Sequence, residues 1–312
     1  MSATDHAAAA AANEIPLVRR GPWRQALARF RRRPSGILAL FVVALFTAVG
    51  VFAGTLAPYQ AGQEFLQFIQ NPQPPLTAHH LLGTDVLSRD LLTQLIYAIH
   101  QTMFSALVCA GVATVVGVSV GSLAGYYGSW FDALVTWATG IAVSIPAMAV
   151  LVIVLIWSKL PATPVNAGLW LSAVLWTGVA RVVRASVLSL RSREYIEAAQ
   201  ASGASSIRVL VRHLLPNSAG PIIVAASSLA GQAIVIIATV DYLGWSYNTP
   251  ERPTLGGLIA DATQSTHLLT GDVALARVWW LYVFPAALLV VLLMSFAFLG
   301  DALDEALNPS AL

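Results

Sequence analysis

Residues 99–125, IHQTMFSALVCAGVATVVGVSVGSLAG, contain no Asp, Glu, Lys or Arg. A bilayer core of about 30 Å needs about 20 apolar residues in a helix, and one charge at its centre costs about 2.5–3.5 kcal/mol. This stretch therefore predicts a membrane-spanning helix. Five more stretches of similar length, with uncharged middles, predict five more spans: 36–57, 133–157, 167–188, 218–243 and 274–299.

The composition excludes a soluble globular protein. Of the 312 residues, 57% are hydrophobic and only 10% are charged, against about 25% charged in an average soluble domain. Such a chain lacks the charged side chains that would surround a soluble core. The sequence therefore predicts an all-α integral membrane protein with six transmembrane helices, located in the cell or inner membrane.

The basic residues predict the orientation of the chain in the membrane. Of the 17 Lys and Arg residues, most either precede the first span or lie at the end of the fourth and in the loop that follows it. Cytoplasmic loops carry the excess of basic residues, so both termini are expected in the cytoplasm. The residues in these two groups are Arg19, Arg20, Arg24, Arg29, Arg31, Arg32, Arg33, Arg181, Arg184, Arg191, Arg193, Arg208 and Arg212.

The N-terminal segment, 1–35, is basic. Trp23, Ala26, Leu27 and Phe30 fall on one helical face with arginines opposite, which favours an amphipathic helix at the membrane surface; an unstructured basic tail is the alternative. The apolar stretch that follows reaches full spanning length, so we expect an uncleaved helix rather than a signal peptide. The other expected boundaries are a first span 36–57, extracytoplasmic loops 58–98 and 244–273, a core 99–312, a cytoplasmic loop 189–217 and an acidic tail 300–312.

One pentapeptide, GVSVG beginning at Gly117, matches the G-x-S-x-G pattern of serine hydrolases. That motif requires a turn between a strand and a helix, whereas here it falls within a span, and only His100 approaches a span among the histidines. The favoured interpretation is that Gly117, Gly121 and Gly125 form a flat face for close helix packing. An intramembrane hydrolase that uses Ser119 remains an alternative.

Other catalytic and metal chemistry is disfavoured. His79 and His80 have no carboxylate or cysteine at ligand spacing, and Cys109, the only cysteine, is expected to be a packing residue. The only lysine, Lys159, does not complete a P-loop. Ion coupling lacks a mid-membrane charge, since the spans offer only neutral groups such as Gln232. We expect no catalytic residue, metal or cofactor in this chain.

The cytoplasmic loop predicts a helical hairpin. Residues 192–217 read SREYIEAAQASGASSIRVLVRHLLPN. Good helix formers lead to Gly203, which suits a left-handed cap. Ser205 is placed to cap a second helix through its hydroxyl, and Pro216 to end that helix. The apolar face of the second helix is predicted to consist of Ile207, Leu210, Val211 and Leu214.

The first helix of this hairpin predicts a small outward-facing tip. Glu197, Ala198 and Ala199 would present a carboxylate and little bulk, which suits insertion into a groove of another protein. The alternative is an ordinary amphipathic loop on lipid headgroups, which would account for Arg208 and Arg212 equally well.

Several motifs resemble the permease subunits of ABC importers. "EAA" at 197–199, with Gly203 and "LP" after it, is similar to the EAA motif of that family, and "RHLLPN" at 212–217 is similar to its dipeptide, oligopeptide and nickel branch. "LGTDVLSRD" at 82–90 resembles a loop motif of the same branch, with Ser88 where the branch has glycine. Further similar segments are 121–132, Pro146, 279–285 and 299–309.

The resemblance implies a function and a set of partners. The chain would be a non-catalytic permease of an ATP-driven importer of peptides or a similar small solute, forming half of the translocation path. The implied partners are a second homologous permease, two ABC ATPase subunits or one double ATPase chain, an extracytoplasmic solute-binding protein and membrane lipid, with no nucleic acid. ATP and Mg²⁺ would bind the ATPases, and this chain would bind no cofactor.

The resemblance also implies residue roles. The EAA loop of the family is a coupling helix, so ATPase-coupling roles are implied for Glu197, Ala198, Ala199, Gly203, Arg208, Arg212 and Pro216. Structural roles in the outer loop are implied for Gly83, Thr84, Asp85, Arg89 and Asp90.

The chain also departs from the branch. Trp137 and Gly140 stand in the third span where an arginine and an aspartate are usual, Leu255 stands where a tryptophan is common, and the tail has Asp304-Glu305 where Arg-Asp is usual. These changes leave open the import of nickel or another non-peptide solute. An exporter permease and an ATP-independent carrier or channel remain alternatives, and the last would transport in liposomes without ATP or partners.

Overall fold

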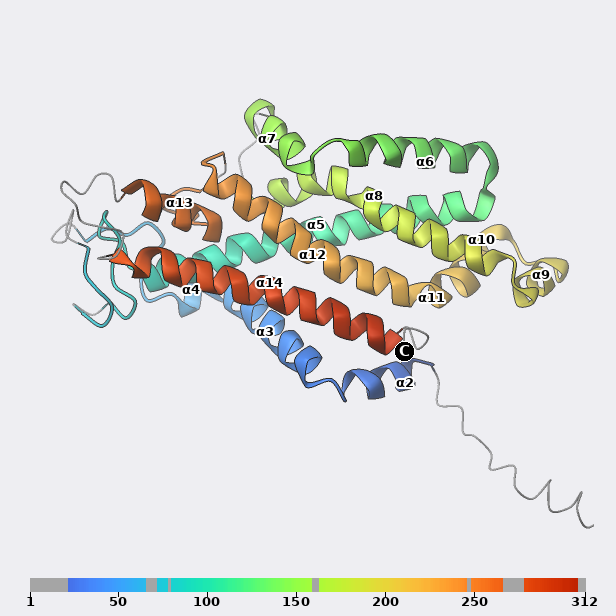
Figure 1. Ribbon diagram of the computed structural model, residues 1–312, viewed down its shortest axis with the longest axis horizontal. Coiled ribbons are helices and arrows are strands. Elements are labelled where there is room, and N and C mark those ends of the chain that lie inside the picture. The colour runs from blue at the N-terminus through green and yellow to red at the C-terminus, as the bar shows by residue number, and fades with distance from the viewer. Residues whose placement is uncertain are drawn as a thin grey trace, which may run out of the picture.

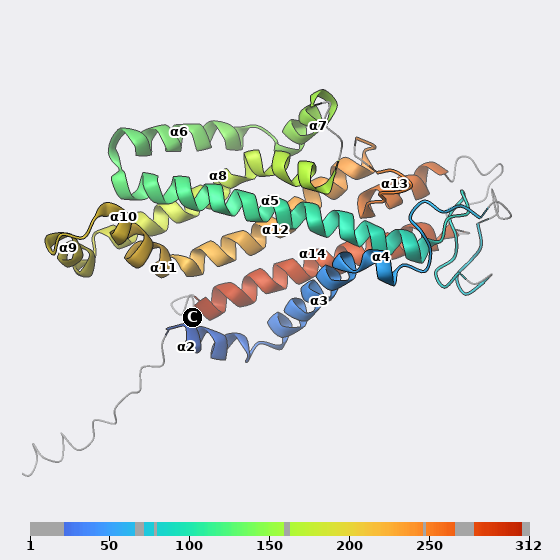
Figure 2. The same cartoon turned by 180° about the vertical axis from the view of Figure 1, so that it is seen from behind.

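The computed structural model describes residues 22–65, 72–77, 80–158, 163–245, 248–265 and 278–307. Residues 1–21 of the N-terminal segment, His79, Lys159 and residues 308–312 of the tail lie outside these ranges. Over the described residues the chain is helical, and its β features are isolated bridges in the outer loops (Figures 1 and 2). The elements are α2 (Pro22–Phe30), α3 (Pro34–Val51), α4 (Ala53–Leu56), α5 (Leu91–Tyr127), α6 (Ser129–Ser144), α7 (Ala147–Trp157), α8 (Pro164–Arg191), α9 (Glu194–Ala201), α10 (Ser206–Val209), the π-helix η2 (Leu210–Leu214), α11 (Leu215–Asn217), α12 (Ala219–Tyr242), α13 (Leu255–Ser265) and α14 (Trp280–Leu307).

The all-α membrane class is confirmed. Within the described ranges, five helices are long and apolar enough to cross a membrane, namely α3, α5, α8, α12 and α14, and the α6–α7 pair makes six if it counts as one span. These helices run along the long axis of the molecule, with α9 and α10 at one end and α13 and the outer loops at the other (Figure 1).

The third span is not the continuous helix expected over 133–157. It consists of α6 and α7, bent by 81° at a short break. Pro146 lacks a backbone N–H to donate, and the residue before a proline is driven out of the helical region; Ile145 is accordingly extended, with φ −92° and ψ 124°. The bend places α7 at the edge of the bundle beside α8 (Figure 1).

Three helices differ in extent from the expected segments. The helix that contains the second expected span starts at Leu91, eight residues before 99, because Asp90 caps α5: its Oδ2 accepts a hydrogen bond from the Thr93 amide at 2.8 Å. The tail expected from 300 is helical to Leu307 in α14. The second outer loop contains an unexpected short helix, α13, in which Leu255 is fully buried.

The pair α5 and α8 forms the centre of the bundle, and its contact depends on glycine. A Cβ atom added to Gly117, Gly121 or Gly125 would lie 2.4–2.9 Å from a backbone carbonyl oxygen of α8, that of Trp176, Ala180 or Arg184 respectively. The glycines recur every four residues on α5, and the carbonyl groups that they face recur every four residues on α8. Because glycine has no side chain, the two helix backbones can approach closely along this face.

The N-terminal basic segment is helical where it is described. In α2, Ala26 is buried, and Arg29 Nη1 donates a hydrogen bond to the Ala306 carbonyl at the end of α14 (3.2 Å). Arg33 forms an ion pair with Glu305. Between the two expected alternatives, residues 22–30 therefore form a helix that packs on the last turn of α14.

Candidate functional site

The hairpin projects from the end of the bundle opposite the outer loops (Figures 1 and 2). Its first helix, α9, is anchored by Ile196, which is fully buried. Glu197 and Ala198 are exposed and Ala199 is half-buried, so the small tip faces outward. Glu197 lies in the first turn of α9, where a carboxylate interacts favourably with the helix dipole.

Gly203 makes the turn of the hairpin. Its φ is +82°, its amide donates to the Gln200 carbonyl (2.9 Å), and the amide of Ala204 donates to the Ala199 carbonyl (3.1 Å). This pair of bonds is a Schellman motif, which places a left-handed residue just after the helix. A Cβ at Gly203 would have nothing within 4 Å, so the backbone conformation alone favours glycine there.

Replacing Gly203 with valine is expected to disrupt the hairpin and leave the bundle intact. A β-branched residue in the left-handed region is a strong outlier, and the strain is on the order of 1–2 kcal/mol. Trypsin added to the protein in detergent should then cleave faster at Arg208 and Arg212. Ala201→Val, at an exposed helical position nearby, is the control. Equal cleavage in both variants would contradict the prediction.

The second arm differs from the expectation in three ways. Ser205 precedes α10 but its side chain makes no capping bond. Pro216 does not end a helix, because it lies within α11, which follows the π-helix η2. In an α-helix the ring of a proline clashes with the carbonyl four residues earlier, here that of Arg212. Arg212 lies in η2, where the wider π-helical turn relieves this clash. The buried face contains Val209 with Leu210 and Leu214, whereas the expected members Ile207 and Val211 are exposed.

The surface of the hairpin combines charge with exposed apolar side chains. Arg208 and Arg212 are exposed, and neither forms an ion pair with another described residue. Tyr195, Ile207 and Val211 are also exposed, and Ile207 is the most exposed of the three at 69%. Aromatic and arginine side chains are enriched in protein interfaces, so this composition fits a surface that contacts another protein.

Two polar side chains, Gln200 and Arg191, join α9 and the end of α8 to the end of α5. Gln200 in α9 donates to the Tyr126 hydroxyl (3.3 Å), and Arg191 Nη1 donates to the carbonyls of Gly125 (3.2 Å) and Tyr126 (3.3 Å). About two helix turns before Arg191 on α8, Arg184 pairs with Asp132 of α6, with Nη2 and Oδ2 2.7 Å apart. These bonds connect α9 and the end of α8 to the α5–α6 corner. Sequence reasoning missed these contacts, because the partners are 52–74 residues apart.

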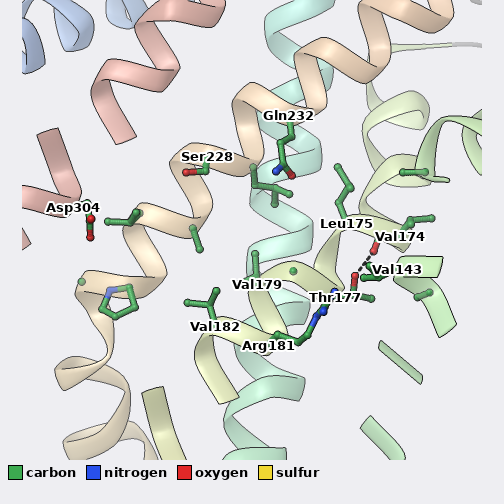
Figure 3. A pocket seen from close by; sticks show the side chains of 18 of the residues that line it. Val143, Val174, Leu175, Thr177, Val179, Arg181, Val182, Ser228, Gln232 and Asp304 are labelled. Carbon is green, nitrogen blue, oxygen red and sulfur yellow. Dashed lines mark hydrogen bonds between the residues drawn. The ribbon is translucent and has the colours of Figure 1, made fainter. Parts of the chain in front are cut away.

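A cavity of about 970 Å³ opens between the α6–α7 bend, α8, α12 and the end of α14. Its wall is mostly apolar, and Pro146 at the bend and Pro221 of α12 border it. The labelled side chains converge on it from several helices (Figure 3). Its polar or charged lining residues are Thr177, Arg181, Asn217, Ser228, Gln232 and Asp304. A space of this size with a few polar groups suits passage or binding of a small polar solute.

The described residues offer no catalytic or metal constellation. The Ser119 hydroxyl donates to the Val115 carbonyl in its own helix (2.8 Å), and His100 Nδ1 lies 2.7 Å from the Gly50 carbonyl oxygen. No group of three His, Cys, Asp or Glu residues is placed to hold a metal within the described ranges.

The outer-loop motif is a buried, internally bonded unit. Asp85 Oδ1 accepts from the amides of Leu87 (3.0 Å) and Arg89 (2.8 Å), and its Oδ2 accepts from Arg89 Nε (2.7 Å) and Gln94 Nε2 (3.1 Å). Asp90 Oδ1 lies 2.8 Å from His80 Nδ1. These bonds brace the entry into α5.

Two backbone positions fix the rest of this loop. A Cβ at Gly83, whose φ is +83°, would lie 2.4 Å from the Gln73 carbonyl oxygen. The neighbouring carbonyl of Thr84 accepts a hydrogen bond from the Trp280 indole of α14 (3.2 Å).

The carboxyl group of Asp261 in α13 makes the stability of this region depend on pH. Burial raises the pKa of this carboxyl, although Asn248 donates a hydrogen bond to it. The region therefore loses stability as the pH rises through that raised pKa.

Replacing Asp85 with alanine is expected to open the outer loop. The change leaves Arg89, only 7% exposed, without its carboxylate, and an unpaired buried charge costs about 3–5 kcal/mol. Protease added to the outer face should then cleave residues 80–90 roughly tenfold faster or more. Glu64→Ala, an exposed carboxylate of the same loop, is the control. Loss of solute binding with unchanged protease resistance would instead place Asp85 in contact with the solute.

Replacing Ser88 with glycine is expected to stabilise the same loop. Ser88 has φ +61°, and its buried hydroxyl has no hydrogen-bond partner among the described residues. Removing left-handed strain should raise the free energy of unfolding by about 1 kcal/mol. The measurement is the temperature at which Cys109, the only cysteine and fully buried in α5, reacts with a thiol dye. A lower midpoint than that of the wild type would contradict the prediction.

The sequence was compared with known families and proteins. The family described as binding-protein-dependent transport system inner membrane component matches residues 117–311, and the N-terminal TM domain of oligopeptide transport permease C matches residues 21–75. The oligopeptide transport system permease protein OppC of Mycobacterium tuberculosis (strain ATCC 25618 / H37Rv) is 32% identical over 283 residues, covering 91% of this chain and 93% of that one. The dipeptide transport system permease protein DppC of Alkalihalophilus pseudofirmus is 30% identical over 293 residues, covering 92% and 90%.

Two further similarities extend the comparison. The glutathione transport system permease protein GsiD of Escherichia coli O6:K15:H31 is 29% identical over 306 residues, covering 96% of each chain. A chain of the inward-facing MetNI methionine ABC transporter superposes with a TM-score of 0.50 at 21% identity, covering 71% of this chain and 99% of that one, which shows a shared fold. The chain is a multi-pass membrane protein, and it belongs to the family of inner membrane components of binding-protein-dependent transport systems.

Proposed function

We propose that this chain is a permease subunit of an ATP-driven importer of small peptides and forms half of the translocation path. The observation that carries the proposal is the exposed α9–α10 hairpin at one end of a bundle whose cavity is lined by the α6–α7 bend, α8 and α12. The substrate class is supported by the relatives, which are named as permeases for oligopeptides, dipeptides and glutathione.

The partners of such a permease follow from its two ends. The hairpin would dock into two ABC ATPase subunits, or one double ATPase chain, through Glu197, Ala198, Ala199 and Gly203, with the ends of the chain on the same cytoplasmic side. The outer loops and α13 would meet a solute-binding protein. A second, homologous permease would complete the path, and ATP and Mg²⁺ would bind the ATPases, so this chain itself catalyses nothing and binds no cofactor.

The described contacts support a route for coupling. Closure of the ATPases would move α9, and the bonds from Gln200 and Arg191 to the end of α5 would pass that movement to the α5–α6 corner. The α6–α7 bend lines the cavity, so a shift of α6 changes the shape of the cavity wall. The cavity would thus open alternately to each side of the membrane.

Co-purification tests this function most directly. The tagged chain would be extracted in mild detergent from its native membrane, and the proteins that accompany it identified, for the wild type and for Glu197→Lys. We expect a second permease and a P-loop ATPase with the wild type, and loss of the ATPase alone with the variant. Recovery of the chain alone, or an ATPase indifferent to Glu197, would overturn the proposal in favour of a carrier or channel.

A further inference from the structure

Arg181 is the basic side chain of the large cavity. It is exposed on α8, ten residues before the helix ends at Arg191, or about 15 Å along the helix axis from that end. Among the described residues that line the cavity it is the sole basic one, and the wall around it is largely apolar, including Val179 and Val182. An arginine in a candidate spanning helix, beside an apolar wall, is unfavourable unless water, a partner or a ligand meets it.

Arg181 has no partner among the described residues, although its neighbour Arg184 does. Arg184, one turn further along α8, forms an ion pair with Asp132. Arg181 forms no ion pair or hydrogen bond with any other described residue. The acidic residue of the same cavity, Asp304 of α14, lies on the other side of it (Figure 3). The guanidinium of Arg181 is therefore available to an anion inside the cavity.

Arg181 also borders a second, smaller space on the side of α8 that faces α6. A second space of about 180 Å³ lies between α6 and α8 and is lined by Thr139, Gly140, Arg181 and Arg184 among others. A Cβ added to Gly140 would meet nothing within 4 Å. No α6 side chain at that position covers Arg181, and none supplies it with a carboxylate.

We propose that Arg181 binds the carboxylate of the solute as it crosses the membrane, so that the path selects peptides with a free carboxyl group. The inference rests on the proposed function and names the recognition chemistry of its path. A guanidinium binds a carboxylate through two parallel hydrogen bonds, which an ammonium does not reproduce. Loss of such a charge-assisted contact should reduce uptake roughly tenfold or more.

The test uses the complete transporter, with its partners, in proteoliposomes that accumulate labelled trialanine. Arg181→Gln should lower the uptake roughly tenfold, with ATP hydrolysis stimulated by the binding protein as in the wild type. Arg181→Cys should be equally poor. An aminoethyl thiol reagent, which adds an ammonium group, should then restore part of the uptake through its charge alone, whereas a methyl thiol reagent should restore none. Cys109 is fully buried and stays unmodified.

Gly140→Asp tests the inference independently. It should place a carboxylate beside Arg181 that competes with the solute, so trialanine uptake should fall. Gly140→Asn, of the same size but uncharged, should change uptake by less than about twofold. Combining Gly140→Asp with Arg181→Gln should be no worse than Arg181→Gln alone, because both act on one contact.

Several outcomes would overturn the inference. These are wild-type uptake by Arg181→Gln, equal rescue by the two reagents, or equal loss in the Asp and Asn variants at 140. A defect seen only in vesicles with anionic lipid, and absent in pure phosphatidylcholine, would assign Arg181 to a lipid phosphate instead. A wild-type complex that hydrolyses ATP with its binding protein but accumulates no trialanine would overturn the proposed substrate class, and the inference with it.

Discussion

Glu197→Lys is expected to reduce ATP-driven uptake at least about tenfold while the chain reaches the membrane in normal amount. Glu197 is exposed and forms no ion pair with another described residue, so charge reversal removes no contact within the chain. The buried anchor Ile196 remains in place, and the loss of a favourable helix-dipole interaction is worth only about 0.3–1 kcal/mol. The main effect should therefore fall on the proposed docking surface, where a reversed charge would face the ATPase.

The measurement is uptake and ATP hydrolysis in the same proteoliposomes. We expect the variant to lose uptake together with the stimulation of hydrolysis by the binding protein. Asp301→Lys is the matched control, because it reverses an exposed carboxylate of α14 outside the hairpin, and it should retain uptake. Wild-type uptake by Glu197→Lys would refute the coupling role and favour a hairpin that only rests on lipid.

The spans were predictable because the membrane imposes a length and an absence of charge that a single sequence displays directly. Uncharged stretches located α3, α5, α8, α12 and α14 to within one to eight residues at most ends. The bend between α6 and α7 has a local cause, Pro146, but hydropathy alone cannot separate a bent pair from one span, since both are equally apolar.

The candidate site was predictable where the backbone decides it and not where tertiary contacts do. Gly203 and Asp90 act on their own helix ends, so the local sequence contains the reason for them. Pro216 shows the limit: a local rule predicts a helix end, but the π-helix before it gives the proline room.

The long-range contacts have no such local reason. The bond from Trp280 to Thr84, for example, joins residues that are 196 positions apart, and no periodicity or spacing reports it. The cavity around Arg181 is likewise a product of how α6, α8 and α12 pack, which a single sequence does not display.

Gly121→Ala is expected to destabilise the bundle strongly for so small a change. The added Cβ would lie 2.4 Å from the Ala180 carbonyl oxygen, 2.9 Å from the Ala180 Cα and 3.0 Å from its carbonyl carbon. These are backbone atoms of α8, so no side-chain rotation relieves the overlap and the two central helices must move apart. Overpacking of this kind costs about 1–3 kcal/mol, and more where the neighbour cannot shift.

Gly111→Ala is the matched control, because Gly111 lies on the same helix and a Cβ there would meet nothing within 4 Å. Alanine favours a helix over glycine by about 1 kcal/mol, so this variant should be at least as stable as the wild type. Thermal exposure of Cys109 measures both variants in one assay. A lower midpoint for Gly121→Ala alone would establish that close approach of α5 and α8 stabilises the bundle; equal midpoints would mean that the helices separate at little cost and that the glycine face is not what holds them together.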